Sequence, residues 1–202
     1  FRSYSDWPLL QTSDPHDANY ISAEYQAGPC LPDQSQATVQ SLKVRFDQKG
    51  HERPFQKAVI VDSVDGYLKA GDHIIIRLGD RRFGGPGTRV QTFVEENFRI
   101  RCYIDPLGTS RFAAVPGDSV IQVVPGEPAQ LVMTAPRVVR TGEPVALRVR
   151  AEDQWGNTCW NRAEKVALTA TLDGKRVYEQ QRVLADQGWA VALLDNIPVD
   201  KG

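Results

Sequence analysis

The chain has 202 residues, of which 41% are hydrophobic and 24% are charged, so it can bury a core in one domain or in two small ones. Its 24 lysines and arginines nearly balance 25 acidic residues, and the net charge of −1 provides no general attraction for nucleic acid or an anionic membrane. No apolar run reaches the roughly eighteen residues that span a bilayer. The sequence therefore predicts neither a nucleic-acid partner nor a membrane span.

The first part of the chain is predicted to consist of strands. Its first twenty residues have no sustained period, so we expect a loop that is ordered by packing. In the segment 88–105, the apolar Phe98, Ile100, Cys102 and Ile104 alternate with polar residues, which predicts one dry and one wet sheet face. The strands predicted here are residues 20–26, 37–46, 55–64, 72–80, 88–105 and 118–126, the last with the apolar density of a buried strand.

A second module is predicted to begin near Glu127. Val145, Leu147 and Val149 alternate with polar or small residues, as in a strand, and the Asp-Gly pair in the segment 172–175 predicts a hairpin. Turn signals recur every ten residues or so, which is typical of an immunoglobulin-like sandwich, although about 75 residues is short for its seven strands. We therefore expect this module to be truncated.

The sequence as a whole predicts an all-β chain of two β-sandwich modules, residues 1–126 and residues 127–202, the second immunoglobulin-like. No stretch keeps a 3.6-residue apolar stripe for three turns, which excludes a helical or α/β architecture. The chain begins at Phe1, without methionine, and stops soon after a strand-like run. We interpret it as a piece of a longer protein.

The segment Arg77 to Phe93, "RLGDRRFGGPGTRVQTF", is the strongest candidate for a binding site. Proline and glycines at 84–87 do not suit a regular strand, so a loop is predicted. Seven arginines between Arg77 and Arg111 face four acidic residues, a local excess of three positive charges. Loop amides beside guanidinium groups can bind phosphate, sulfate or carboxylate. The residues predicted to form this anion site are Asp80, Arg81, Arg82 and Arg89.

A structural role is the alternative for the same loop. Asp80 would accept hydrogen bonds from loop amides or from an arginine, and the other arginines would be solvated or would dock onto another part of the protein. The loop lacks the Lys-Ser or Lys-Thr ending and the following helix of a phosphate-binding P-loop.

Other candidate sites have weaker patterns, and we expect no catalytic residue, metal or cofactor. His16, His51 and His73 are scattered along the chain. The spacing of Asp62, Asp65 and Asp72 suits a self-capped turn better than a calcium loop. Three cysteines, Cys30, Cys102 and Cys159, are predicted to be buried free thiols. Trp155 and Trp160 could stack on sugar rings, but packing is the commoner role of tryptophan.

Three motifs in one order resemble the amino-terminal region of a bacterial family called domain of unknown function 3604. They are "SDWPLLQTSDPHDANYIS", "LKAGDHIIIRLGDRRFGGPGTRVQTF" and "FAAVPGDSVIQVVPGEPAQLVMTAPRVVRTGEPVALRVRAEDQWGN". The match spans most of the chain, roughly Asp6 to Asn157. The resemblance implies two sandwich modules that precede a metal-dependent hydrolase domain of the polymerase-and-histidinol-phosphatase type. The clustered histidines and aspartates of such a domain are not found in this chain, so no catalytic residue is carried over.

The segment "GEPVALRVRAEDQWGN" also resembles bacterial immunoglobulin-like repeats of surface proteins, in which a strand ends in an Asp-x-x-Gly-Asn turn. Asp153, Gly156 and Asn157 match that turn. This motif implies a fold and not an activity.

These patterns lead to two functional hypotheses. In the first, the chain is a non-catalytic accessory region, and its partner is a downstream domain of the same protein, against which it packs or to which it presents substrate. In the second, it is a stand-alone ligand-binding or surface-adhesion module for an anionic or carbohydrate ligand. The compartment and the oligomeric state are not predicted.

Overall fold

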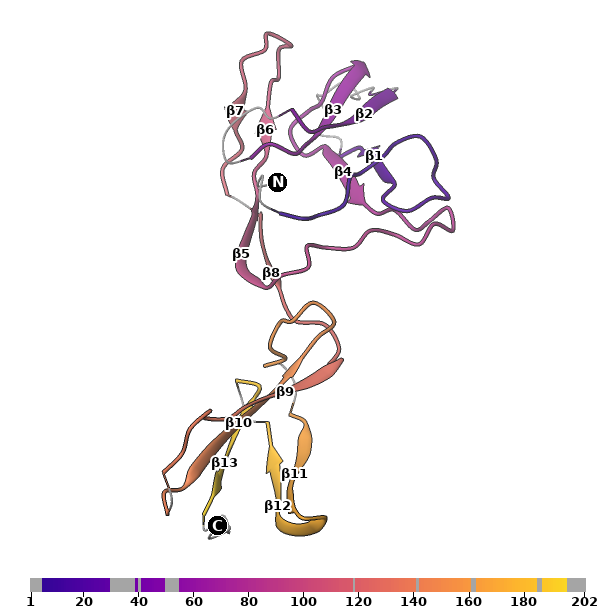
Figure 1. Ribbon diagram of the computed structural model, residues 1–202. Coiled ribbons are helices and arrows are strands. Elements are labelled where there is room, and N and C mark those ends of the chain that lie inside the picture. The colour runs from indigo at the N-terminus through magenta and orange to yellow at the C-terminus, as the bar shows by residue number, and fades with distance from the viewer. Residues whose placement is uncertain are drawn as a thin grey trace. The chain divides into compact units, whose positions relative to one another are not determined.

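The computed structural model describes residues 5–29, 39, 41–49, 55–117, 119–140, 142–160, 163–184 and 187–195. These residues form strands and loops and no helix, which confirms the predicted all-β class (Figure 1). It follows that none of them belongs to a helix long and apolar enough to cross a membrane. Contacts divide the chain into two compact units, the first of Phe1–Thr92 with Arg99–Val120 and the second of Phe93–Phe98 with Ile121–Gly202.

The first unit is built from two-stranded antiparallel sheets. Strand β1 pairs with β4, β2 with β3, and the short β6 with β7. Strand β5 pairs with β8, and the residues of both strands are divided between the two units. The hairpin that carries β6 and β7 forms a long arm in Figure 1. The strands are β1 (Ile21–Gln26), β2 (Ser41–Asp47), β3 (Ala58–Asp65), β4 (His73–Leu78), β5 (Glu95–Ile100), β6 (Tyr103–Ile104), β7 (Ala113–Ala114) and β8 (Ser119–Val123).

The β1–β4 pair has one apolar and one largely polar face, and this positions the candidate site. Ile21 lies opposite Leu78, and in the same register Ser22 lies opposite Arg77. Because side chains alternate between the faces of a sheet, Glu24 shares the face of Ser22 and Arg77. A polar face thus runs to the point where β4 ends and the arginine-rich loop begins.

The prediction for the segment 88–105 is wrong at both ends. Strand β5 begins only at Glu95, because Thr88 and Thr92 bond to side chains of the amino-terminal segment instead of to a neighbouring strand. Phe98 is fully buried as expected, but Ile104 is exposed in the hairpin arm. The prediction that the strand in residues 118–126 is buried is also wrong. Val123 is the only buried residue of β8.

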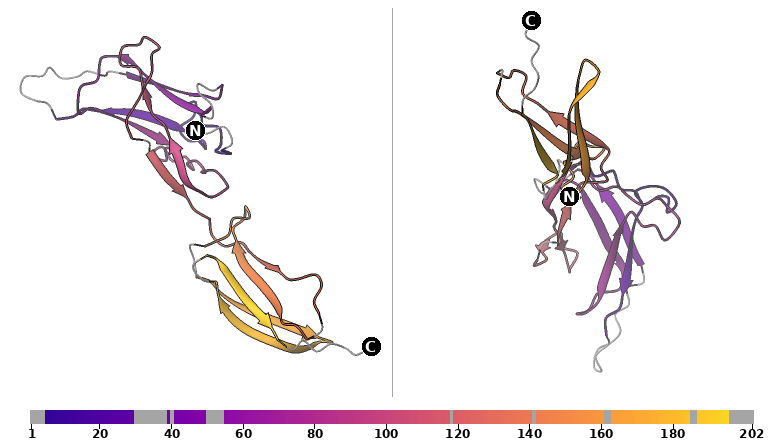
Figure 2. Two further views of the ribbon diagram at one scale, coloured as in Figure 1. Left: turned by 90° about the vertical axis from the view of Figure 1, so that its left-hand side faces the viewer. Right: turned by 90° about the horizontal axis from the view of Figure 1, so that it is seen from below.

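The second unit is a sandwich of two antiparallel sheets. One sheet has the order β13-β10-β9, and the other is the pair β11-β12 (Figure 2). The Asp173-Gly174 turn joins β11 to β12, with φ of 48° and 75° at these two residues, as the sequence predicts. The predicted boundary between residues 126 and 127 falls inside this unit. Its strands are β9 (Gln130–Thr134), β10 (Val145–Glu152), β11 (Lys165–Leu172), β12 (Lys175–Val183) and β13 (Trp189–Leu194).

Both sheets of the second unit contribute to one core. Val149 of β10 lies opposite Ala190 of β13, and both are buried against Val166 and Leu168 of β11. The alternation of Val145, Leu147 and Val149 read from the sequence therefore marks the inner face of the sheet. The whole core consists of Val149, Ala151, Cys159, Val166, Leu168, Leu184, Ala190 and Ala192.

Candidate functional site

The arginine-rich segment leaves β4 as a loop that closes on itself at its neck. Gly79 has a φ of +70°, and a Cβ atom placed on it would lie 2.3 Å from the backbone nitrogen of Thr88. Gly87 has a φ of +93°, and a Cβ atom there would lie 3.2 Å from Cδ of Arg81. Only glycine combines this backbone conformation with such close approach. The glycines therefore form the predicted loop, and two of them are required by its neck.

Asp80 is the buried centre of the loop, with 3% of its surface exposed. Its Oδ1 accepts hydrogen bonds from the backbone nitrogen and from Nε of Arg82, both at 3.0 Å. Its Oδ2 accepts from Oγ of Ser22 at 2.6 Å and from Nη2 of Arg82 at 2.7 Å. The hydrogen bonds from Arg82 are the main cause that holds the pKa of Asp80 far below its usual value. An ionised Asp80 thus fixes the side chain of Arg82.

The same network clamps the loop to β1. Arg82 Nη1 donates to Oε2 of Glu24 at 2.6 Å, and Arg77 Nη2 donates to Oε1 of Glu24 at 2.7 Å. These bonds, from Arg77 first and then from Arg82, lower the pKa of Glu24. The charges of two guanidinium groups and two carboxylates therefore cancel. The network is neutral, and its hydrogen bonds and ion pairs fix the position of the loop.

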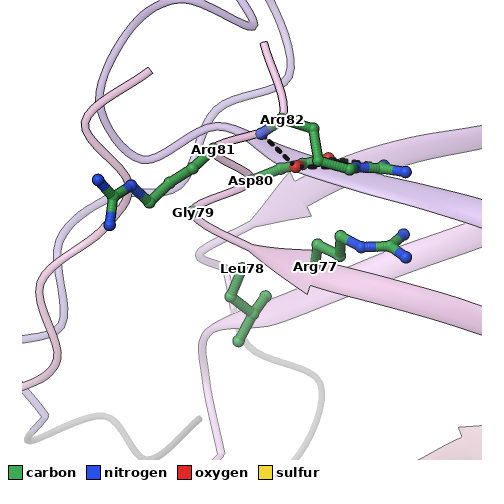
Figure 3. A pocket seen from close by; sticks show the side chains of 6 residues that line it. All are labelled: Arg77, Leu78, Gly79, Asp80, Arg81 and Arg82. Carbon is green, nitrogen blue, oxygen red and sulfur yellow. Dashed lines mark hydrogen bonds and ion pairs between the residues drawn. The ribbon is translucent and has the colours of Figure 1, made fainter. Parts of the chain in front are cut away.

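Arg81 extends in the other direction. An open groove of about 620 Å³ is lined by the consecutive residues Arg77–Arg82. Figure 3 shows Arg77 and Arg82 on one side of the backbone and Arg81 on the opposite side. Among the residues that the structure describes, the Arg81 guanidinium has no hydrogen bond or ion pair. It is therefore the arginine of this loop that is best placed to meet a solute anion.

Arg89 belongs to a different contact of the loop. Its Nη1 lies 3.4 Å from Oδ2 of Asp6, which also accepts a 2.6 Å hydrogen bond from Oγ1 of Thr92. Burial would raise the pKa of Asp6, but the bonds from Thr92 and Arg89 outweigh it and lower that pKa. Arg89 thus ties the end of the loop to Asp6 of the amino-terminal segment.

Of the four residues predicted to bind an anion, the structure brings Asp80 and Arg82 together and places Arg81 and Arg89 apart from them. Asp80 has the internal role that the alternative interpretation describes. Ser22 and Glu24 complete the network, and sequence reasoning missed both. Ser22 is 58 residues from Asp80 in the sequence, and Glu24 is 58 residues from Arg82. The polar face of β1 was therefore the only sequence signal for these contacts. Anion binding by Arg81 stays a prediction.

A second buried carboxylate, Asp153, organises the turn after β10, and only 1% of its surface is exposed. Its Oδ1 accepts from the backbone nitrogens of Trp155 and Asn157, both at 2.9 Å. Its Oδ2 accepts from the Gly126 nitrogen at 3.0 Å and from Asn157 Nδ2 at 2.9 Å. Burial alone would raise the pKa of Asp153, but the bonds from Asn157, Gly126 and Trp155 together lower it. The Asp-x-x-Gly-Asn pattern therefore marks a turn that is stabilised by the hydrogen bonds of Asp153.

The histidines do not come together in the described residues. Nδ1 of His16 lies 2.7 Å from the backbone oxygen of Phe83, and His73 is exposed at the start of β4. His51 lies outside the described residues. Within the described ranges, no three His, Cys, Asp or Glu side chains gather closely enough to hold a metal ion.

Asp72, one of the three aspartates weighed for calcium, caps local backbone. It accepts from the nitrogens of Gly28 at 2.8 Å and Lys69 at 2.9 Å, and from the Tyr25 hydroxyl at 3.0 Å. The bonds from Gly28 and then Lys69 lower its pKa. Of the other two aspartates, Asp62 lies 3.5 Å from Nε of Arg45 and Asp65 ends β3.

The cysteines and tryptophans differ from one another in exposure. Cys159 is buried and forms no disulfide, as predicted. Cys102 also forms no disulfide, but the prediction that it is buried is wrong. Cys102 is exposed because it follows β5 in the hairpin arm, where the chain leaves the core. Cys30 lies outside the described residues. Trp155 and Trp160 are both partly exposed, so packing does not enclose either ring completely.

Comparison with known proteins finds no matching family model, no similar curated protein and no similar solved structure. The likeness to the amino-terminal region of domain of unknown function 3604 is therefore a prediction from the motifs alone.

Proposed function

We propose that this chain is a non-catalytic accessory region of a larger protein, which packs against a neighbouring domain or presents substrate to it. The motif resemblance suggests a metal-dependent hydrolase as that domain. The observation that carries the proposal is the exposure of large apolar side chains in both units. Soluble proteins seldom leave contiguous apolar surface uncovered unless it meets a partner.

The hairpin arm of the first unit gives the clearest case. Leu107 is 81% exposed and Phe112 is 65% exposed, although the tip between them is held in place. Asp105 accepts from the backbone nitrogens of Leu107 at 3.3 Å and Ser110 at 2.7 Å. Burial would raise the pKa of Asp105, but the backbone bonds outweigh it and lower that pKa. An apolar tip that is ordered before binding loses little entropy on docking, which favours a protein partner.

The charged groups support the same assignment. Asp80, Asp153 and Asp72 each use their carboxylate oxygens to hold backbone or side chains of their own unit. Their lowered pKa values suit structural acceptors, whereas a general acid or base works best with a pKa near the working pH.

The test uses the natural protein that contains this chain and a Leu107→Ser, Phe112→Ser double variant of it. We expect the variant to lower the melting temperature of the neighbouring domain or to raise its KM, because the docking surface is lost. Leu9→Ser is the matched control, since Leu9 is an exposed apolar residue outside the arm. Unchanged stability and kinetics in the double variant would contradict docking by the arm. Hydrolytic activity or stoichiometric zinc or manganese in the 202-residue chain alone would contradict the non-catalytic role.

A second candidate function is ligand binding in the groove beside Arg81. The guanidinium of Arg81 is exposed and has no hydrogen bond or ion pair among the described residues. Titration calorimetry with inorganic phosphate and with sulfate should show binding that Arg81→Ala abolishes and that Arg111→Ala, a change at another exposed arginine, leaves intact. Equal heats for the wild-type chain and Arg81→Ala would exclude this site.

A carbohydrate ligand is the other form of that alternative. Trp155 and Trp160 are partly exposed, and tryptophan rings can stack on sugars. Electrophoresis in gels that contain a soluble polysaccharide should retard the wild-type chain more than Trp160→Ala. Equal mobility with and without polysaccharide would remove this option.

A further inference from the structure

Among the residues that the structure describes, none encloses the inner side of β9 in the second unit. Met133 and Leu131 share the inner face with Val149 and Ala151, to which they are directly paired. Val149 and Ala151 are 2% and 1% exposed, whereas Met133 is 58% and Leu131 is 59% exposed. Two large side chains therefore lie at core positions of the sheet and stay more than half exposed. They continue the established core between the sheets.

The opposite sheet explains why β9 is uncovered. Strands in a sheet lie about 4.8 Å apart, so a pair of strands cannot cover the inner face of three. Nε of Arg182, which lies on β12, donates to the backbone oxygen of Val191 on β13 at 3.3 Å. This contact places β12 on the β13 side of the sandwich. The remaining edge of the pair, that of β11, thus faces the β9 side, where Leu131 and Met133 lie.

That edge of β11 is able to pair with a further strand. Among the described residues, β11 has β12 as its one partner strand. A strand added there would extend the smaller sheet over β9, and its inward side chains would contact Leu131 and Met133.

The order of the strands indicates which strand of a sandwich would take this place. The order β9-β10-β13 in one sheet and β11-β12 in the other corresponds to strands A, B and E facing C and C′ of an immunoglobulin-like sandwich. In that fold the two strands that follow E form a hairpin, and the first of them pairs with C. In this chain, β13 takes the place of E and β11 the place of C.

We propose that a β-hairpin which follows β13 in the natural protein docks in this position, with its first strand on the free edge of β11 and its inward side chains over Leu131 and Met133. The occupant is the protein's own continuing chain, because a Greek-key sandwich passes directly from E to the strand beside C. This inference extends the proposed accessory role, since it also requires a longer protein, but its test measures no activity. A result that contradicts docking by the hairpin arm can therefore be distinguished from a result that contradicts the added hairpin.

The experiment compares the 202-residue chain with the natural protein after Met133→Cys is introduced in both. Cys30 and Cys102 are replaced by serine, and Cys159 stays as the buried thiol. The rate of maleimide labelling is followed by mass spectrometry. We expect Cys at position 133 to react at least about tenfold more slowly in the natural protein, because reaction then requires local opening of the hairpin. Thr134→Cys is the matched control, since Thr134 lies on the outer face of the same strand and should react equally in both chains.

Equal labelling of Met133→Cys in the two chains would overturn the proposal. Protection in the 202-residue chain that grows with protein concentration, together with a dimer in sedimentation, would also overturn it, because a second copy would then be the occupant. Protection in the natural protein alone, with Thr134→Cys unaffected, is the result that supports the proposal.

Discussion

Asp80 in the first unit and Asp153 in the second are both buried carboxylates that hold a turn, yet they do so with different partners. Asp80 bonds mainly to the guanidinium of Arg82, whose side chain is partly exposed, while Asp153 accepts four hydrogen bonds from neutral N–H groups. A charged partner at the surface can return to water when the pair is broken. The four N–H groups around Asp153 are part-buried and lose their one acceptor together, so the loss of this carboxylate costs more free energy. The Asp153 turn should therefore be the more sensitive of the two.

The largest effect is expected for Asp153→Ala. A hydrogen bond contributes about 1 kcal/mol net, and four are lost together, so we expect the second unit to lose about 3 kcal/mol or more. The thiol of Cys159 provides a local probe, because its Sγ lies 3.7 Å from the Gly126 oxygen beside this turn. Its labelling should accelerate by at least about a hundredfold in the variant. Asp195→Ala, at an exposed position, is the control. An unchanged rate in Asp153→Ala would show that the turn does not depend on the carboxylate.

The next largest loss of stability is expected when a glycine in the Asp80 loop is replaced by alanine. Gly79→Ala combines a φ of +70° with a Cβ contact of 2.3 Å to backbone, so we expect the first unit to lose about 2–4 kcal/mol. Gly84→Ala in the same loop and Gly156→Ala in the Asp153 turn have positive φ but open space around the new Cβ. They should cost only about 1 kcal/mol each. Chemical denaturation of the three variants measures their free energies of unfolding. Equal losses would mean that the backbone around Gly79 shifts to accommodate the added methyl group.

A smaller effect is expected for Arg82→Gln. The change removes the charged partner of Asp80 and one bond to Glu24, but about half of the Arg82 side chain is exposed, so water can replace part of what is lost. We expect a loss of stability well below that in Asp153→Ala. Hydrogen exchange of the segment 79–92 should increase, while that of the segment 150–160 stays as in the wild type. An equal loss in Arg82→Gln and Asp153→Ala would contradict the distinction between charged and neutral partners.

The same comparison shows which parts of the fold the sequence could predict. Alternation identified the inner face of β10, and the Asp-Gly pair at 173–174 identified its hairpin, because both signals are local. Alternation failed beyond Phe98, since the chain leaves the core in the hairpin arm and an apolar residue such as Ile104 is not enclosed there. Periodicity reports which residues could share a face, but it does not report whether another layer covers that face.

For the candidate sites, the sequence predicted residues but not partners. The loop of Asp80 was recognised from its glycines and arginines, and an internal role for Asp80 was one of two interpretations. That role depends on Ser22 and Glu24, which lie on a strand far away in the sequence. Asp153, in contrast, was found through a motif because three of its four donors lie within four residues of it. Hydrogen-bond networks between residues close in sequence produce a recognisable motif. Networks between distant residues produce only strands with polar faces that could meet.

The smallest effect concerns pH and acts on both turns in the same direction. Both carboxyls have a folded pKa below the usual value of 3.8. Each therefore contributes stability that is fully present above pH 3.8 and is lost as the pH falls through its folded pKa. Hydrogen exchange between pH 5 and pH 2.5 should show the segment 150–160 opening towards acid in the wild type. In Asp153→Asn that segment should already be open at pH 5 and change less with pH, because no proton is taken up there. An equally steep change in Asp153→Asn would assign the acid sensitivity of the second unit to other carboxyl groups.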